Sequence, residues 1–385
     1  MNRQPNPYRP GFNQAPRVLV GREAVLASAD EALAVAALDA RTPRPILLVG
    51  PRGVGKTVTL GEIAARAAER RSWPTVHVEV RPRTPFTAAL VERLRNVRTL
   101  LEGATVTRRG RLRVSGGTIK AEPFGIGGEI DLTTTAAPTP AMPLEDALAQ
   151  CLDAAVRRSA GVVLAVDELQ LADRRELADL AAALQAHVPD RWPLVFVAAG
   201  LPTLREPTKS VTYLERAEWH ELGLLSLEDS ISALRGPAEE AGRPMSAPAA
   251  DELATAAGGY PFAVQVMGHH AWRASTGAGA ISVAHARKAV ASAQADLATG
   301  LYASRWDAAA PREREYLRAL AELSASGTRG SEVSGADVAR HLGEGTREVS
   351  YLRDRLLKKG TLFTRGRALQ FVTPGMGEWV LRQVP

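Results

Sequence analysis

Residues 45–69 read PILLVGPRGVGKTVTLGEIAARAAE and place a short apolar run, a glycine-rich stretch, a Lys-Thr pair and an amphipathic pattern in direct succession. The apolar run predicts a buried strand, and the spacing of the apolar residues after it predicts a helix. Glycines between such a strand and helix allow a tight loop whose backbone N–H groups all point inward. This stretch therefore favours a layered α/β fold with an anion site where the strand meets the helix.

The loop matches the pattern G-x-x-x-x-G-K-[ST], which cradles the phosphates of a nucleotide. Lys56 is expected to neutralise the β- and γ-phosphates, and the Thr57 hydroxyl to ligate Mg²⁺. A glycine-rich turn with a solvated lysine is the simpler alternative. The predicted nucleotide-binding residues of the loop are Gly50, Gly53, Val54, Gly55, Lys56, Thr57 and Val58.

An acidic pair follows a second apolar run, in VVLAVDELQ. Asp167 and Glu168 would lie at the carboxyl edge of a parallel sheet, where ligands of open α/β sheets bind. We expect Asp167 to hold Mg²⁺ and Glu168 to act as the general base that polarises the attacking water. Together with the glycine-rich loop, the pair predicts a nucleotide hydrolase that uses Mg²⁺, or at least a nucleotide-dependent switch.

Short apolar strands alternate with helical patterns up to about residue 224, which indicates a parallel sheet covered on both faces. We predict four segments in the chain. They are a Pro-rich extension (1–16), the P-loop domain (17–224, with an insertion at 102–143), a helical domain (225–304) and a C-terminal domain (305–385). The insertion is rich in glycine and basic residues, and is interpreted as a β-hairpin or a loop.

The C-terminal segment predicts two helices joined by a turn, followed by a two-stranded ribbon, the outline of a winged helix. Residues 346–367 hold seven basic and two acidic residues, whereas the whole chain has a net charge of +6. This local excess is typical of a duplex-binding surface, although a winged helix used for protein contacts stays open. The predicted DNA contacts are Arg347, Arg353, Arg365 and Arg367, with Arg109 and Arg111 in the insertion.

Three motifs carry a family resemblance. VLVGRE (18–23) resembles the adenine-contact motif of AAA+ ATPases, VDELQ is similar to the Walker B element of their origin-recognition and STAND branches, and GGYP (258–261) resembles the STAND lid motif. The resemblance implies an AAA+ αβα sandwich with a helical lid and a C-terminal winged helix. It also implies nucleotide contacts from Val20, Arg22 and Pro261.

The resemblance further implies that Arg216 is an arginine finger, which reaches the γ-phosphate of a neighbouring subunit in an ATP-dependent homo-oligomer. One position departs from the family. Ala199-Gly200 stands where most AAA+ proteins place a polar sensor, so slow, switch-like hydrolysis is expected.

Three functions stay open. The first is a DNA-binding ATPase of replication, transposition or a mobile element. The second is a STAND-type signalling or defence switch that acts on a protein partner, and the third is an ATP-responsive transcription regulator. The polar N-terminus and the lack of a membrane-length apolar run favour a cytoplasmic protein.

Overall fold

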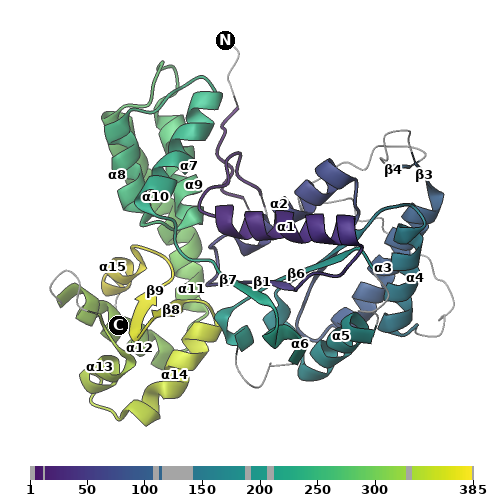
Figure 1. Cartoon of the computed structure of the whole chain (residues 1–385). Coiled ribbons are helices and arrows are strands. Elements are labelled where there is room, and N and C mark those ends of the chain that lie inside the picture. Colours follow the sequence, from purple (N-terminus) through teal and green to yellow (C-terminus); the bar gives the residue numbers. More distant parts are fainter. Residues whose placement is uncertain are drawn as a thin grey trace, which may run out of the picture.

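The computed structural model describes residues 5–11, 14–106, 112–114, 142–186, 192–205, 212–326 and 332–383. Figure 1 shows a sheet-containing domain, a helical domain and a C-terminal domain that lies beside both. The predicted contacts Arg109 and Arg111 fall outside the described residues. No helix within these ranges is long and apolar enough to cross a membrane.

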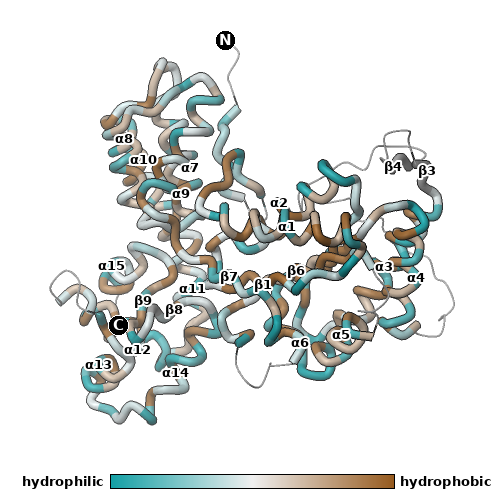
Figure 2. Tube along the Cα trace, in the orientation of Figure 1, coloured by the Kyte–Doolittle hydropathy of each residue, from teal (hydrophilic) through white to brown (hydrophobic). Residues whose placement is uncertain are grey.

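Five parallel strands form the main sheet in the described part of the chain, in the order β2-β5-β6-β1-β7. The strands are β1 (Ile46–Val49), β2 (Thr75–Glu79), β5 (Val162–Asp167), β6 (Leu194–Gly200) and β7 (Glu218–Glu221). Every residue of β1, β5 and β6 is buried. Figure 2 shows brown, hydrophobic segments in the part of the sheet beside the β6 label. The predicted α/β sandwich with a parallel sheet is therefore confirmed.

Helices cover the two faces of this sheet, as the apolar strands require. They are α1 (Glu23–Asp39), α2 (Lys56–Arg71), α3 (Phe86–Gly103), α4 (Leu144–Val156), α5 (Arg174–Ala186) and α6 (Thr212–Glu215), with the 3₁₀ turns η1 (Leu169–Leu171) and η3 (Pro202–Arg205). In the insertion, β3 (Ala104–Val106) pairs antiparallel with β4 (Leu112–Val114), as in the hairpin interpretation.

The helical domain packs around an apolar core that it shares with residues of the C-terminal domain, among them Val372, Met376 and Val380. Its helices are α7 (Leu227–Glu240), α8 (Ala247–Ala257), α9 (Pro261–Ala274) and α10 (Val283–Leu297). The N-terminal segment is part of this core, because Tyr8 is buried and its hydroxyl donates to the carbonyl of Leu234. A Cβ on Gly268 would lie 2.4 Å from the Tyr8 ring, so a glycine is needed for this close approach.

The C-terminal domain follows without a break in the helix. Helix α10 continues through the π-helical turn η4 (Ala298–Tyr302) into α11 (Ala303–Asp307), across the expected boundary at residue 304. The remaining elements are α12 (Pro311–Ser326), α13 (Gly335–His341), α14 (Thr346–Lys358), β8 (Leu362–Arg365), β9 (Ala368–Phe371) and α15 (Met376–Leu381). The antiparallel pair β8–β9 follows α14, in the order expected of a winged helix.

Candidate nucleotide site

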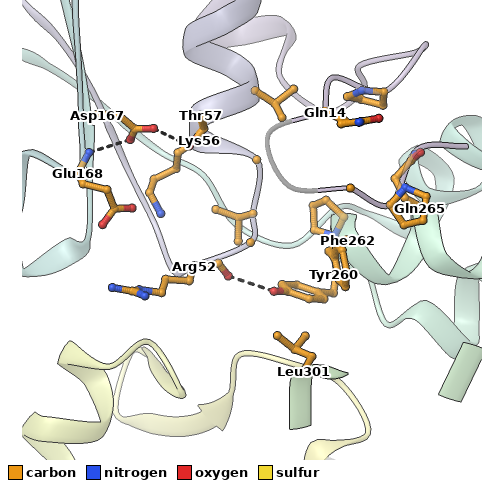
Figure 3. Close-up of a pocket in the computed structure, with 18 of the residues that line it drawn as sticks. Gln14, Arg52, Lys56, Thr57, Asp167, Glu168, Tyr260, Phe262, Gln265 and Leu301 are labelled. Atoms are coloured by element: carbon orange, nitrogen blue, oxygen red, sulfur yellow. Dashed lines mark hydrogen bonds between the residues drawn. The ribbon is translucent and has the colours of Figure 1, made fainter. Parts of the chain in front are cut away.

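A cavity of about 980 Å³ lies at the carboxyl edge of the sheet, beside the loop between β1 and α2. Figure 3 shows its phosphate-loop side, with Lys56, Thr57, Asp167 and Glu168 close together. Residues from every part of the chain line it, from the N-terminal segment to the C-terminal domain. Of the predicted site residues, the cavity is lined by Val20, Arg22, Gly53, Val54, Gly55, Lys56, Thr57, Val58, Asp167, Glu168 and Pro261.

The loop is built on glycines that no other residue could replace without strain. Gly53 and Gly55 have φ angles of +80° and +93°, a conformation that side chains disfavour. A Cβ on Gly53 would lie 1.9 Å from the Tyr260 hydroxyl, and one on Gly50 would lie 2.1 Å from the carbonyl oxygen of Leu222. Gly50 packs against the Leu222 carbonyl and does not line the cavity.

Lys56 is held against the loop itself. Its Nζ donates to the carbonyl oxygens of Gly50 at 2.8 Å and Pro51 at 2.7 Å, and its side chain is buried. Burial lowers the pKa of Lys56 to about 8, against the opposing charges of Glu168 and Asp167. The partners of this buried ammonium among the described residues are neutral carbonyls, so it is well suited to bind an anion that replaces them.

Asp167 ends β5 directly beside the loop. Its Oδ2 accepts from the Thr57 hydroxyl at 2.6 Å, and its Oδ1 accepts from the Glu168 backbone N–H at 2.8 Å. Burial raises the pKa of this carboxyl group, and the bond from Thr57 opposes that shift. A hydroxyl next to a carboxylate provides the oxygen ligands that Mg²⁺ prefers, so these residues fit that ion.

No group of three or more His, Cys, Asp and Glu side chains arranged to hold a metal occurs in the part of the chain that the structure describes. Thr57 and Asp167 alone are too few to hold a divalent cation tightly. Mg²⁺ keeps several waters and binds with phosphates in sites of this kind. The arrangement therefore fits an ion that arrives with its nucleotide.

Arg22 connects the N-terminal motif to the loop. Its guanidinium donates to the backbone carbonyls of Val54 at 2.7 Å and Gly223 at 3.1 Å. Burial lowers the pKa of this arginine. It therefore ties the phosphate loop to the segment that precedes the helical domain. Val20 packs half-buried against the core of that domain. Adenine recognition by these two residues stays a prediction.

Sequence reasoning missed several cations that line the cavity, among them Arg52 in the loop and Arg305 on α11. Arg305 donates to the hydroxyls of Thr373 and, at 3.4 Å, Tyr260. Burial lowers the pKa of Arg305, and the charge of Arg52 lowers it further. Within the described ranges Arg305 forms no ion pair with a carboxylate. A pattern search could not find it, because it lies in an ordinary helix far along the chain.

The C-terminal domain reaches the cavity through Lys359 and Thr361. Between them, Gly360 is in the left-handed region at φ +67°. A Cβ at Gly360 would lie 2.8 Å from Cδ of Arg52, so the turn after α14 contacts the phosphate loop. The C-terminal domain, which the sequence predicts to bind DNA, therefore forms part of the wall of the nucleotide cavity.

Arg216 lies away from this cavity. It is exposed and precedes β7, whose first residue Glu218 pairs with Ile46 at the start of β1. It is therefore at the amino edge of the sheet, opposite the phosphate loop. Its backbone carbonyl accepts from Arg44 at 2.9 Å. Any contact between Arg216 and a nucleotide would have to be made to another subunit, and this stays a prediction.

The predicted DNA contacts differ in their surroundings. Arg347 and Arg367 are exposed, and Arg365 is the last residue of β8. Arg353 is half-buried and forms an ion pair with Asp354 at 3.0 Å. DNA binding by these arginines stays a prediction.

Two of the seven basic residues counted in residues 346–367 bind a buried carboxylate within the domain. Arg355 and Lys359 lie 2.8 Å and 2.5 Å from the carboxylate oxygens of Glu313, which is fully buried. Burial alone would raise the pKa of Glu313, but the bonds from Lys359 and the Ala310 N–H keep it below its usual value. These two cations therefore stabilise the domain, and fewer remain for phosphates.

Comparison with known proteins agrees with this geometry. Residues 18–197 match the family described as AAA ATPase domain. The chain therefore contains an AAA ATPase domain, as expected of an AAA+ P-loop ATPase. Beyond the AAA+ core, residues 299–380 match a domain of unknown function. A search of curated protein sequences finds no match.

Two of the solved structures that match nearly the whole chain share its fold, with TM-scores of 0.60 and 0.59. The Walker-type ATPase of Pyrococcus abyssi is 14% identical, with 94% of this chain and 96% of that chain covered and a TM-score of 0.60. The Aeropyrum pernix ORC2 protein, in ADPNP and ADP complexes, is 15% identical, with 96% of each chain covered and a TM-score of 0.59. The Thermotoga maritima RuvB Holliday junction branch migration motor is 18% identical over 97% of this chain and 100% of that chain, with a TM-score of 0.49.

Proposed function

We propose that this AAA+ protein is a slow ATPase that uses the bound nucleotide to set the position of its C-terminal domain, and that this domain binds duplex DNA. One observation carries the proposal. The cavity that holds Lys56, Asp167 and Glu168 is also lined by Pro261 of the helical domain and Lys359 of the C-terminal domain. A nucleotide bound there touches the domains that it would have to move.

The chemistry follows from the residues at the floor of the cavity. Lys56 would release the loop carbonyls and bind phosphate oxygens. Thr57 and Asp167 would hold Mg²⁺, which would supply positive charge beside the phosphates. Glu168 orients and deprotonates the attacking water. The α2 helix begins at Lys56 and directs its positive N-terminal end at the same place.

Duplex DNA is the proposed partner because Arg347 and Arg367 are exposed at the start of α14 and in the turn between β8 and β9. A solved protein with the same fold is an ORC2 protein. We also propose assembly in the ATP state, in which Arg216 reaches the site of a neighbour. The exposure of Arg216 and its distance from its own cavity support this role.

A signalling or defence switch is the second candidate, and a specific contact favours it. Gly360 packs against Arg52, so the C-terminal domain is positioned as an internal brace on the phosphate loop. In that case the nucleotide would release the domain toward a protein partner. The engagement of Arg355 and Lys359 by Glu313 also leaves fewer cations for DNA.

The test is ATP hydrolysis and duplex gel shift with wild-type protein, Lys56→Ala and Glu168→Gln. We expect Lys56→Ala to lose tight ATP binding, and Glu168→Gln to bind ATP but hydrolyse it about 10²–10⁴-fold more slowly. A duplex shift that requires ATP supports the DNA function. Hydrolysis without any duplex shift favours the signalling switch, and the absence of Lys56-dependent hydrolysis refutes the ATPase.

A further inference from the structure

The chain turns sharply directly after Asp167. Glu168 has φ +53° and ψ +34°, a left-handed conformation that is costly for a residue with a side chain. The chain then enters η1 at once. As a result, Gln170 points back into the protein and is buried, with a relative exposure of 8%.

Both the nitrogen and the oxygen of the Gln170 side-chain amide form hydrogen bonds. Its Nε2 donates to Oε2 of Glu168 at 2.6 Å, and its Oε1 accepts from the backbone N–H of Leu201 at 2.9 Å. The N–H of Leu201 can only donate and an ionised carboxylate can only accept. The orientation of the amide is therefore set by its partners.

These bonds join the general base to the end of β6. Leu201 follows Gly200, the last residue of that strand, and a Cβ on Gly200 would lie 2.9 Å from Oε1 of Gln170. The glycine thus leaves the space that the amide occupies. Ala199 and Gly200 offer no polar side chain at this place. Among the described residues, Gln170 provides the only side-chain amide that reaches the end of β6, and it does so from the turn that follows the neighbouring strand β5.

We propose that Gln170 is a positioning residue for ATP hydrolysis, which fixes the Glu168 carboxylate relative to β6 and replaces the polar sensor that β6 lacks. The inference rests on the proposed ATPase function. A carboxylate held on one oxygen keeps its other oxygen in a defined direction toward the cavity, which Glu168 lines. Without the amide, Glu168 would sample several rotamers and spend less time beside the attacking water.

The first experiment tests the hydrogen bond between Glu168 and Gln170 through the melting temperature of the protein, without measuring ATP hydrolysis. Gln170→Glu removes the amide donor to Glu168 and places two carboxylates side by side, which repel each other. We expect its melting temperature to fall by about 2–4 °C relative to wild type at pH 8. The double variant Glu168→Gln/Gln170→Glu restores donor and acceptor in exchanged places and should regain most of the loss.

The second experiment measures how the Gln170 side chain affects the rate of ATP hydrolysis. Gln170→Leu keeps the approximate size and adds no charge, and we expect its kcat to fall about tenfold or more with nucleotide affinity unchanged. The exchanged double variant should stay as slow as Glu168→Gln, because its carboxylate has moved.

The results separate the two proposals. Equal melting temperatures of Gln170→Glu and the exchanged variant at pH 8 would overturn the positioning inference, whether or not the protein hydrolyses ATP. So would wild-type kcat in Gln170→Leu, provided that wild-type turnover is lost in Lys56→Ala. If the wild type shows no Lys56-dependent turnover, the proposed function fails, and the melting temperatures alone decide whether Gln170 holds Glu168.

Discussion

Arg52 of the phosphate loop lies against Gly360 of the C-terminal domain, so close that a Cβ at Gly360 would come within 2.8 Å of the arginine side chain. Tyr260 of the helical domain meets the same loop, and its hydroxyl lies 3.5 Å from the Arg52 carbonyl oxygen. Figure 3 shows this tyrosine beside the loop. Both outer domains thus contact the peptide segment that would hold the phosphates.

The contact at Gly360 can be tested with a matched glycine. Gly360 and Gly343 have similar φ angles of +67° and +71°, but nothing lies within 4 Å of a Cβ at Gly343. Alanine at either position therefore costs about 1 kcal/mol of backbone strain. We expect Gly360→Ala alone to change ATP affinity, by about threefold or more, in a fluorescent-nucleotide titration. Equal affinities of the two variants would show that the contact does not reach the nucleotide site.

Lys56 should make ATP binding depend on pH. Burial lowers its pKa to about 8, so the side chain loses its proton in the nucleotide-free protein as the pH rises past that value. Phosphates require the charged form. We therefore expect the Kd for ATP to rise by up to about tenfold per pH unit above pH 8 and to stay flat just below it.

Lys56→Arg is the control for this titration, because arginine keeps its charge throughout the range. Its Kd should be weaker overall but nearly constant from pH 7 to pH 9.5. A slope in Lys56→Arg equal to that of the wild type would assign the pH dependence to another group.

Arg305 should recognise phosphate. It is a cation on the cavity wall whose hydrogen-bond partners in the described structure are neutral hydroxyls. We expect Arg305→Gln to weaken ATP binding about tenfold, the scale of one charge-assisted bond. Its melting temperature should hardly change, since a desolvated charge is removed together with its bonds.

Arg235→Gln is a suitable comparison for Arg305, because Arg235 is exposed on α7 and pairs with Glu239 at 3.0 Å outside the cavity. Isothermal titration with ATP and ADP should leave this variant unchanged. Wild-type affinity in Arg305→Gln would remove Arg305 from the nucleotide site.

The arginines of the β8–β9 ribbon should bind the phosphates of duplex DNA. Neutralising Arg365 and Arg367 together is expected to lower the slope of log affinity against log salt by about 1–2, since each phosphate that a cation neutralises adds about 0.9 to that slope. ATP binding should be unaffected, because Arg367 does not line the cavity. Arg287→Gln, on an exposed face of α10, provides the control. An unchanged slope would argue for the protein-directed switch.

Local sequence was enough to predict the centre of the fold. Each apolar strand and the loop at Gly50–Thr57 is defined by neighbouring residues, and the order of strand, loop and helix follows from them. Strand β7 was missed because its sequence EWHE has no apolar pattern. It forms through pairing with β1, a partner far away in the chain.

The rest of the site depends on contacts between distant segments. Gln170 and Leu201 are 31 residues apart, and Tyr260 and Arg52 are 208 apart. No periodicity or motif records such pairs. The charge available for DNA contacts likewise depends on residues from distant segments. The basic excess in residues 346–367 was visible, but the buried Glu313 that binds Arg355 and Lys359 lies outside that window.

The central claim is that the nucleotide sets the position of the C-terminal domain, and a distance measurement tests it most directly. Cys151 is buried, and burial raises its thiol pKa to about 12, so introduced cysteines can be labelled selectively. Spin labels at Leu38→Cys on α1 and Glu378→Cys on α15 report the separation of the two domains. We expect different distance distributions with Mg-ATP and with Mg-ADP in a Glu168→Gln background, and no difference when Lys56→Ala is added. Identical distributions with ATP, with ADP and without nucleotide would contradict the account.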